Sequence, residues 1–309
     1  MEPYAELGGI KIGKNHPTRI MGVINVSPES FFKHSVRQSE REVLDAVEHM
    51  IENGADILDI GGRSTAPYHT STITVEEEIK RTKHIVELLT ETFTIPVSID
   101  TTRAEVAEYA AKAGATIVND VYGFEDERIV EVVREYSMSA VVGVSPSKVE
   151  TVKATVEETV EALKSSLAKA VEKGVEIKKL AVDPCIGFYG ERGEYREEDV
   201  KRFLTELEQA ETTPTVPWYV RDFLLLASID KVQKALGRPA VVGVSRKSFL
   251  RLPTSRRKPE ERLYASLAAE VYAVLKGAAV IRTHNVRETR DVAKVIEWIK
   301  LTEEKLAER

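Results

Sequence analysis

Short apolar runs that end in polar residues alternate along the chain with longer amphipathic segments. Each run has the length of a strand and lacks the apolar–polar alternation of a half-exposed one, so we expect strands that are buried on both faces. The eight expected strands are Ile20–Asn25, Ile57–Ile60, Val97–Asp100, Ile117–Asn119, Ala140–Val144, Leu180–Asp183, Val241–Val244 and Val280–Thr283.

A segment with helical periodicity follows each run, and several of these helices end at a glycine just before the next strand. The expected helices are Gln38–Asn53, Val75–Thr92, Arg103–Ala113, Glu125–Glu135, Val152–Lys173, Leu224–Leu236, Glu260–Lys276 and Val286–Glu304. Eight alternating strands and helices predict an α/β fold, a single-domain (β/α)8 TIM barrel. An open doubly wound sheet is the alternative, but no strand is followed by a glycine-rich dinucleotide fingerprint.

The chain of 309 residues has the length of one large barrel with additions. Residues 1–18 are expected to form a small N-terminal segment at the base of the barrel, a hairpin or plug, and residues 19–309 the barrel itself. An irregular insertion is expected around 189–217. The apolar stripe of the last helix can belong to the core or to a dimer face, and the core is the default assignment; the stripe comprises Val292, Val295, Ile296, Trp298 and Ile299.

Composition narrows the function classes. The net charge of −6 gives no reason to expect a nucleic-acid or membrane-surface binder. The single cysteine, Cys185, excludes an internal disulfide or a multi-cysteine metal site. No apolar run reaches about 18 residues and no signal-peptide pattern is present, so a cytoplasmic protein is expected.

Polar residues stand where the expected strands end, and in a TIM barrel these ends surround one mouth. They are Asn25, Asp59, Asp100, Asn119, Asp183, Lys247, Arg282 and His284. Asp59, like Asp120, is open to a simpler interpretation as a residue that closes a turn. The side-chain oxygens of Asp100, Asn119 and Asp183 can accept hydrogen bonds from the amino and N–H groups of a nitrogen-rich ring. Arg282 and a protonated His284, on one side of the last strand, suit phosphate oxygens. The pattern therefore predicts a phosphorylated, nitrogen-rich ligand.

Eight segments are spread over most of the chain from Ile20 to Ile299: MGVINVSPESF, DILDIGGRST, VSIDTTRAEVA, IVNDVYG, VDPCIGF, VVGVSRKSF, ERLYASLAAEVYAVLKGA and IRTHNVRET. In this order they resemble the motifs of the dihydropteroate synthase family. The chain is similar to a divergent, archaeal-like member. The resemblance implies a transferase that joins 6-hydroxymethyl-7,8-dihydropterin diphosphate to an arylamine and releases diphosphate.

The resemblance also implies roles for individual residues. Catalysis would depend on Lys247, Arg282 and His284. The pterin would be held by Asp100, Asn119, Asp183 and Lys247. The diphosphate would contact Asn25, Thr65, Arg282 and His284, and Asn25 would be the protein ligand of a Mg²⁺ cofactor. The arylamine would lie against Phe188, Pro67 and Ser248, the last at the N-terminus of a helix.

The chain departs from the family pattern in the loops. In the second loop Arg63 replaces the usual acid and Ala66 the usual arginine, and the first, fifth and sixth loops also differ. Both 4-aminobenzoate and a ribosylated aminobenzene phosphate are therefore open as the second substrate.

Two other functions stay open at this point. One is a pterin-binding methyltransferase module, which would need no diphosphate site; the other is a pterin-binding protein without catalytic activity. Besides small-molecule substrates, the expected partner is a second copy of the chain in a homodimer, with no nucleic acid or membrane involved.

Overall fold

The structure is a computed structural model that describes residues 3–13, 15–26, 36–63, 73–144, 156–188, 218–255 and 258–308, together with Thr205. Of positions 36–39 and 218 it describes the backbone alone. The insertion expected around 189–217 lies outside the described residues except for Thr205, and so does the start of the helix expected at Val152.

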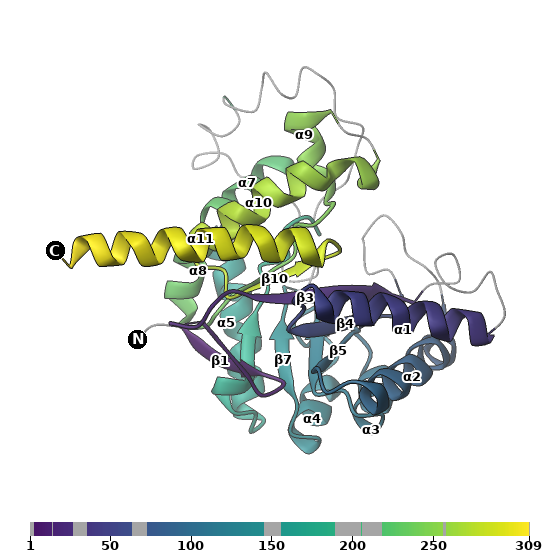
Figure 1. Cartoon of the computed structure of the whole chain (residues 1–309). Helices are drawn as coiled ribbons and strands as arrows, with labels where there is room; N and C mark the ends of the chain where they lie inside the picture. Colours follow the sequence, from purple (N-terminus) through teal and green to yellow (C-terminus); the bar gives the residue numbers. More distant parts are fainter. Residues whose placement is uncertain are drawn as a thin grey trace.

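Eight parallel strands form the centre of the molecule (Figure 1). They are β3 (Arg19–Asn25), β4 (Ile57–Gly61), β5 (Val97–Asp100), β6 (Ile117–Asp120), β7 (Ser139–Val142), β8 (Leu180–Val182), β9 (Val241–Val242) and β10 (Val280–Thr283). Their order is β8-β7-β6-β5-β4-β3-β10-β9. A parallel bridge from Val182 to Ala240 brings the two end strands together, so the predicted barrel is confirmed.

Helices surround the strands on the outside. They are α1 (Val36–Glu52), α2 (Val75–Thr92), α3 (Ala104–Lys112), α4 (Arg128–Glu135), α5 (Val156–Glu172), α7 (Trp218–Ala227), α8 (Ile229–Leu236), α9 (Arg251–Thr254), α10 (Leu263–Leu275) and α11 (Val286–Ala307), with 3-10 turns η2 (Ile177–Lys179), η3 (Ser248–Leu250) and η4 (Pro259–Arg262).

The glycines that the sequence places between helix and strand have the left-handed backbone that such helix ends require. Gly54, Gly114 and Gly174 have φ of 92°, 99° and 93°, and Gly237 and Gly277 have φ of 61° and 84°. Residues with a Cβ rarely adopt this conformation, so glycine at these positions both stops the helix and turns the chain toward the next strand.

Two expectations about helices are wrong. The helix expected at Leu224–Leu236 is two helices, α7 and α8, separated at Ser228, whose φ of −115° and ψ of 17° leave the helical region. The segment after Lys247 is not a regular helix but η3 followed by the four-residue α9. It ends at Ser255, which has a left-handed φ of 55°.

An N-terminal hairpin covers the base of the barrel. β1 (Tyr4–Leu7) and β2 (Ile10–Gly13) pair antiparallel, and Ala5, Leu7 and Ile12 are fully buried. They pack in one cluster with residues near the start of the barrel strands, among them Ile57 and Ile117. The base is thus filled with apolar side chains, which leaves the opposite, C-terminal end for polar groups.

Most apolar side chains of the helices pack against the outer face of the strands in a second, larger cluster. On α11, Ile296 is buried, but Val295, Trp298 and Ile299 are 59%, 74% and 47% exposed. The assignment of these three residues to the core is therefore wrong. No described helix is both long enough and apolar enough to span a membrane.

Candidate active site

The polar residues singled out in the sequence lie at the C-terminal end of the barrel. Asn25 and Asp100 are the last residues of β3 and β5, Asn119 lies near the end of β6, and Asp183 follows β8 directly. Arg282 lies on β10. Since all eight strands are parallel, these ends surround a single mouth.

Arg282 forms the centre of a buried charge network at this mouth. Its Nε donates to Asp59 Oδ2 at 2.6 Å, and an Nη atom donates to Asp100 Oδ2 at 2.7 Å. Asn119 Nδ2 donates to the same oxygen of Asp59 at 3.1 Å. Asp59 is fully buried, so it belongs to this network, and its interpretation as a turn residue is wrong. Asp120 does close a turn, because it accepts from the backbone N–H groups of Tyr122 and Phe124.

Two carboxylates share one guanidinium in this network. Burial is the main cause that raises the pKa of Asp100; Arg282 opposes the shift and the neighbouring Asp59 adds to it. Burial alone would lower the pKa of Arg282, but Asp59 and Asp100 raise it above its ordinary value. Arg282 therefore stays charged, and Asp100 gains a proton more readily than an exposed carboxyl group does.

Asn25 lies beside the same network. Gly61 of β4 lies close to both Asn25 and Asp100. A Cβ at this position would lie 3.6 Å from Asn25 Oδ1 and 3.8 Å from Asp100 Cβ. The side-chain oxygen of Asn25 therefore approaches the network from β3.

Lys247 and Phe188, which follow the neighbouring strands β9 and β8, come together at the mouth. Lys247 Nζ lies 3.5 Å from the centre of the Phe188 ring, a cation–π contact. Gly187 makes room for this approach, since a Cβ there would lie 2.9 Å from Lys247 Cδ. Asp183 is buried and accepts from the Cys185 N–H at 2.7 Å. Burial raises the pKa of Asp183, while the Cys185 N–H and Lys247 lower it.

His284 lies next to Ser245. The two are joined at 3.2 Å between Nδ1 and Oγ, and the His284 backbone N–H also donates to Ser245 Oγ at 3.3 Å. Burial, together with Arg282, Arg246 and Lys247, lowers the pKa of His284 to about 3. The ring is therefore neutral, and the expectation of a protonated His284 is wrong because cations surround a buried imidazole. With so low a pKa it is also a poor base, which argues against a Ser245–His284 nucleophilic pair.

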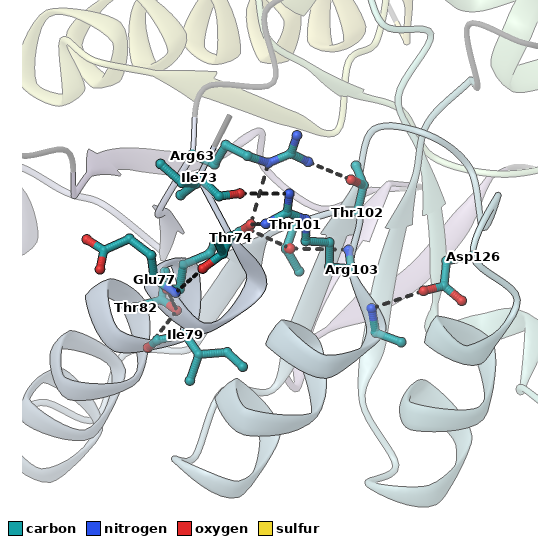
Figure 2. Close-up of polar contacts among 12 residues, drawn as sticks. Arg63, Ile73, Thr74, Glu77, Ile79, Thr82, Thr101, Thr102, Arg103 and Asp126 are labelled. Atoms are coloured by element: carbon teal, nitrogen blue, oxygen red, sulfur yellow. Dashed lines mark hydrogen bonds and ion pairs between the residues drawn. The ribbon is translucent and has the colours of Figure 1, made fainter. Parts of the chain in front are cut away.

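A second buried network, absent from the sequence-based expectations, joins the ends of β4 and β5 to α2 (Figure 2). Glu78 of α2 is 1% exposed, accepts from Thr101 Oγ1 at 2.8 Å and from Arg103 at 2.9 Å, and lies 3.5 Å from Arg63 Nε. Arg63 also donates to Thr102 Oγ1 at 2.8 Å. The arginine that replaces the family's acid is thus held in place by an acid from another element.

Three predicted residues remain. Ser248 begins η3. Thr65 and Pro67 lie outside the described residues. Among the described residues, no group of three or more His, Cys, Asp or Glu side chains is placed to hold a metal ion.

Comparison with known proteins identifies the family. The model of the family described as pterin binding enzyme matches residues 21–284, which is most of the chain. This chain belongs to the pterin-binding enzyme family. The dihydropteroate synthase of Clostridium beijerinckii is 32% identical over 296 residues, 95% of this chain and 98% of that protein. The dihydropteroate synthase of Staphylococcus haemolyticus is 32% identical over 288 residues, 93% of this chain and 96% of that protein.

Solved structures agree with the curated relatives of this pterin-binding enzyme. The Xanthomonas albilineans dihydropteroate synthase with 4-aminobenzoic acid matches with a TM-score of 0.80 and 28% identity, over 97% of this chain and 99% of that one. The same protein in complex with 7,8-dihydropteroate gives a TM-score of 0.77 at 26% identity, over 96% and 99%. The resemblance to dihydropteroate synthase is confirmed, and the chain is an enzyme of this transferase type. These relatives give no support to an archaeal affinity.

Proposed function

We propose that this enzyme is a cytoplasmic transferase that joins 6-hydroxymethyl-7,8-dihydropterin diphosphate to an arylamine and releases diphosphate. The observation that carries the proposal is the mouth itself, where buried carboxylates and the cation Arg282 meet at the ends of parallel strands. Membership of the family, with relatives named dihydropteroate synthase, supports the same reaction.

The pterin is assigned to the buried acceptors at the mouth: Asp100, Asn119 and Asp183, with Lys247 alongside. A ring rich in amino and N–H groups supplies the donors that buried carboxyl oxygens need. One oxygen each of Asp100 and Asn119 is buried without a hydrogen-bond partner among the described residues, which supports a ligand that completes them. The cation–π contact with Phe188 keeps Lys247 at the edge of this site.

The diphosphate is assigned to Arg282 and His284, with Asn25 and Thr65. Arg282 presents a fork suited to phosphate oxygens, and the neutral His284 can donate one N–H without adding charge. A substrate phosphate at Arg282 competes with Asp100 for the guanidinium, and the raised pKa of Asp100 makes this exchange easier because a proton can replace the lost partner.

The reaction proceeds by departure of the diphosphate. As the C–O bond breaks, its electron pair goes to the diphosphate oxygen, where Arg282 and the His284 N–H stabilise the growing charge. The electron-rich pterin ring stabilises the methylene carbon left behind. The amine nitrogen of the second substrate then forms the new C–N bond and releases its proton to water.

The site offers one protein oxygen that could hold a magnesium ion, the side-chain oxygen of Asn25. Mg²⁺ is usually held by one or two protein oxygens together with waters and substrate phosphates. Asn25 Oδ1 is a hard oxygen donor at the mouth, and such an ion would partly neutralise the diphosphate when bound. We therefore keep Asn25 as its protein ligand.

The arylamine is assigned to Phe188, Ser248 and Pro67. The Xanthomonas albilineans relative was solved with 4-aminobenzoic acid, which makes 4-aminobenzoate the first amine to test. Arg63, fixed by Glu78 and Thr102 in the loop after β4, is the cation that distinguishes this chain there. Because Arg63 is a cation, a phosphate-bearing amine is the alternative second substrate.

The test is release of diphosphate from 6-hydroxymethyl-7,8-dihydropterin diphosphate with Mg²⁺, with each amine in turn. Release that depends on an amine, with formation of the coupled product, supports the transferase and selects its second substrate. Pterin binding without release would overturn the proposal in favour of a binding protein. Methyl transfer from a methylated tetrahydropterin would favour the methyltransferase module.

We propose in addition that the enzyme is a homodimer formed through α11. An exposed hollow on this helix is lined by Asp291, Lys294, Val295, Trp298, Ile299, Thr302 and Glu303. Lys294 precedes Trp298 by one turn and Glu303 follows Ile299 by one turn. Two copies of α11 packed antiparallel about Trp298 and Ile299 therefore place each Lys294 near Glu303 of the other copy, as a two-fold interface requires.

A further inference from the structure

A buried acid lies behind the candidate active site, and no step of the proposed reaction uses it. Glu270 lies on α10, on the outer side of β10, and is fully buried. Its Oε2 lies 2.8 Å from Thr289 Oγ1 of α11, whereas Oε1 is buried without a hydrogen-bond partner among the described residues. A carboxyl group so placed is costly to ionise.

Hydroxyl groups lead from Glu270 to the histidine at the mouth. Thr289 Oγ1 lies 3.0 Å from Thr283 Oγ1, which in turn lies 3.5 Å from Ser245 Oγ. Ser245 Oγ then lies 3.2 Å from His284 Nδ1. The three hydroxyls come from α11, β10 and the loop after β9, so only the folded barrel brings them into line.

The charge state of Glu270 decides how this row can be oriented. Burial raises its pKa to about 7, and the nearby Glu288 adds to the shift, while the nearby hydroxyls of Thr289 and Thr283 oppose it. Below that pKa the carboxyl is protonated and can start a row of donors. Each hydroxyl has a single hydrogen, so with a donor at one end the row is bonded at every step only when each following group donates in the same direction.

We propose that Glu270 is a positioning residue that fixes the tautomer of His284 through Thr289, Thr283 and Ser245. The carboxyl donates to Thr289, and the row ends with the Ser245 hydroxyl donating to His284 Nδ1. The neutral imidazole then carries its hydrogen on Nε2, which points away from Ser245 and is free to donate to an anion. The benefit to the reaction rests on the proposed role of His284 toward the diphosphate, but the tautomer itself does not.

The experiment measures the tautomer of His284 in the free protein by ¹⁵N-resolved NMR of its ring nitrogens. The measurement is made at about pH 6, below the pKa of Glu270 and above that of His284. His284→Gln assigns the signals by their loss. The expected wild-type result is a single form with hydrogen on Nε2, and a ring with hydrogen on Nδ1 would overturn the proposal.

Variants then test whether Glu270 acts through the hydroxyls. Glu270→Leu removes the donor, so part of the population should move its hydrogen to Nδ1. Glu270→Gln retains an N–H donor and should restore the wild-type signals. Thr159→Val, a buried threonine of α5, is the matched control and should leave them unchanged.

A double-variant comparison separates relay from simple packing. In a Thr283→Val background the row is already interrupted, so Glu270→Leu should cause no further change in the His284 signals. An equal change in both backgrounds would overturn the relay, as would a Thr283→Val protein with the wild-type tautomer. Thr283→Val keeps the shape of the side chain, so the tautomer of His284 can be measured in this variant even where Glu270→Leu fails to fold.

Diphosphate release is measured separately on the same variants. If the His284 tautomer changes in the variants as expected but the protein releases no diphosphate, this inference stands and the proposed function fails. If the protein has synthase activity but the tautomer is the same in every variant, the proposed function stands and this inference fails.

Discussion

At the scale of single residues, the charge network around Arg282 changes how the mouth is understood. The sequence suggested a pterin end with Asp100 and a phosphate end with Arg282. In the structure the two side chains are bonded directly, and Asp59 holds the guanidinium from its other side. A change at any one of these residues therefore alters the charge state of the others.

Asp59→Asn tests this coupling. The substitution keeps the shape of the side chain and removes a negative charge that raises the pKa of Asp100, so we expect the pKa of Asp100 to fall. A carboxyl ¹³C titration measures it. Glu105→Gln, which changes an exposed carboxylate paired with Arg128, is the control and should leave Asp100 unchanged. A rise in the pKa of Asp100 in Asp59→Asn would contradict the network described here.

At the scale of elements, the strands and the helix ends were readable from the sequence because their signals are local. An apolar run of four residues, or a glycine after a helical stripe, determines its own backbone conformation. The partners of Asp59 and Glu78 could not be predicted in the same way. Arg282 is separated from Asp59 by 223 positions, and Arg103 from Glu78 by 25, so only the closed barrel brings them together.

The partners of Arg63, in the loop after β4, could likewise not be predicted from the sequence. Arg63 was visible as a departure from the family pattern, but nothing next to it in the sequence indicates its partners. The structure supplies Glu78 from α2 and Thr102 from the connection after β5. One buried carboxylate thus holds the starts of two connections that face the mouth.

Glu78→Ala should therefore destabilise the protein more than an ordinary surface change. It leaves Arg63 and Arg103, which are 15% and 24% exposed, without their shared counter-charge. We expect a loss of about 3 kcal/mol in the free energy of unfolding, measured by urea denaturation. Glu77→Ala, on the same turn of α2 with a half-exposed ion pair to Arg81, should cost less than about 1 kcal/mol. Equal losses in the two variants would show that Glu78 is not the element that holds this region together.

At the scale of the whole molecule, α11 relates the barrel to its proposed second copy. Lys294→Glu places like charges opposite each other in the antiparallel arrangement, so the dimer should dissociate at higher protein concentrations than the wild type. The double variant Lys294→Glu with Glu303→Lys restores opposite charges and should restore the dimer. Sedimentation equilibrium measures both, and a wild-type protein that is monomeric throughout would remove the proposed interface.

The buried acid behind the barrel predicts how the stability of the molecule depends on pH. In the folded protein Glu270 keeps its proton up to a pKa of about 7, whereas an exposed glutamate in the unfolded chain loses it near 4.5. Between these values the folded state holds more protons, so raising the pH lowers the free energy of unfolding. The shift corresponds to about 3 kcal/mol, present in full below pH 4.5 and lost as the pH rises through 7.

Glu270→Gln isolates this contribution. The glutamine has no proton to lose, whereas His284 and Asp120, which also titrate abnormally, are present in both proteins and cancel in the difference. Urea denaturation at a series of pH values should show the wild type losing stability relative to the variant from about pH 4.5 to 7, and no further above that range. A difference that is constant with pH would mean that Glu270 ionises as easily in the folded barrel as in water. It would then not serve as the donor from which the orientation of His284 is set.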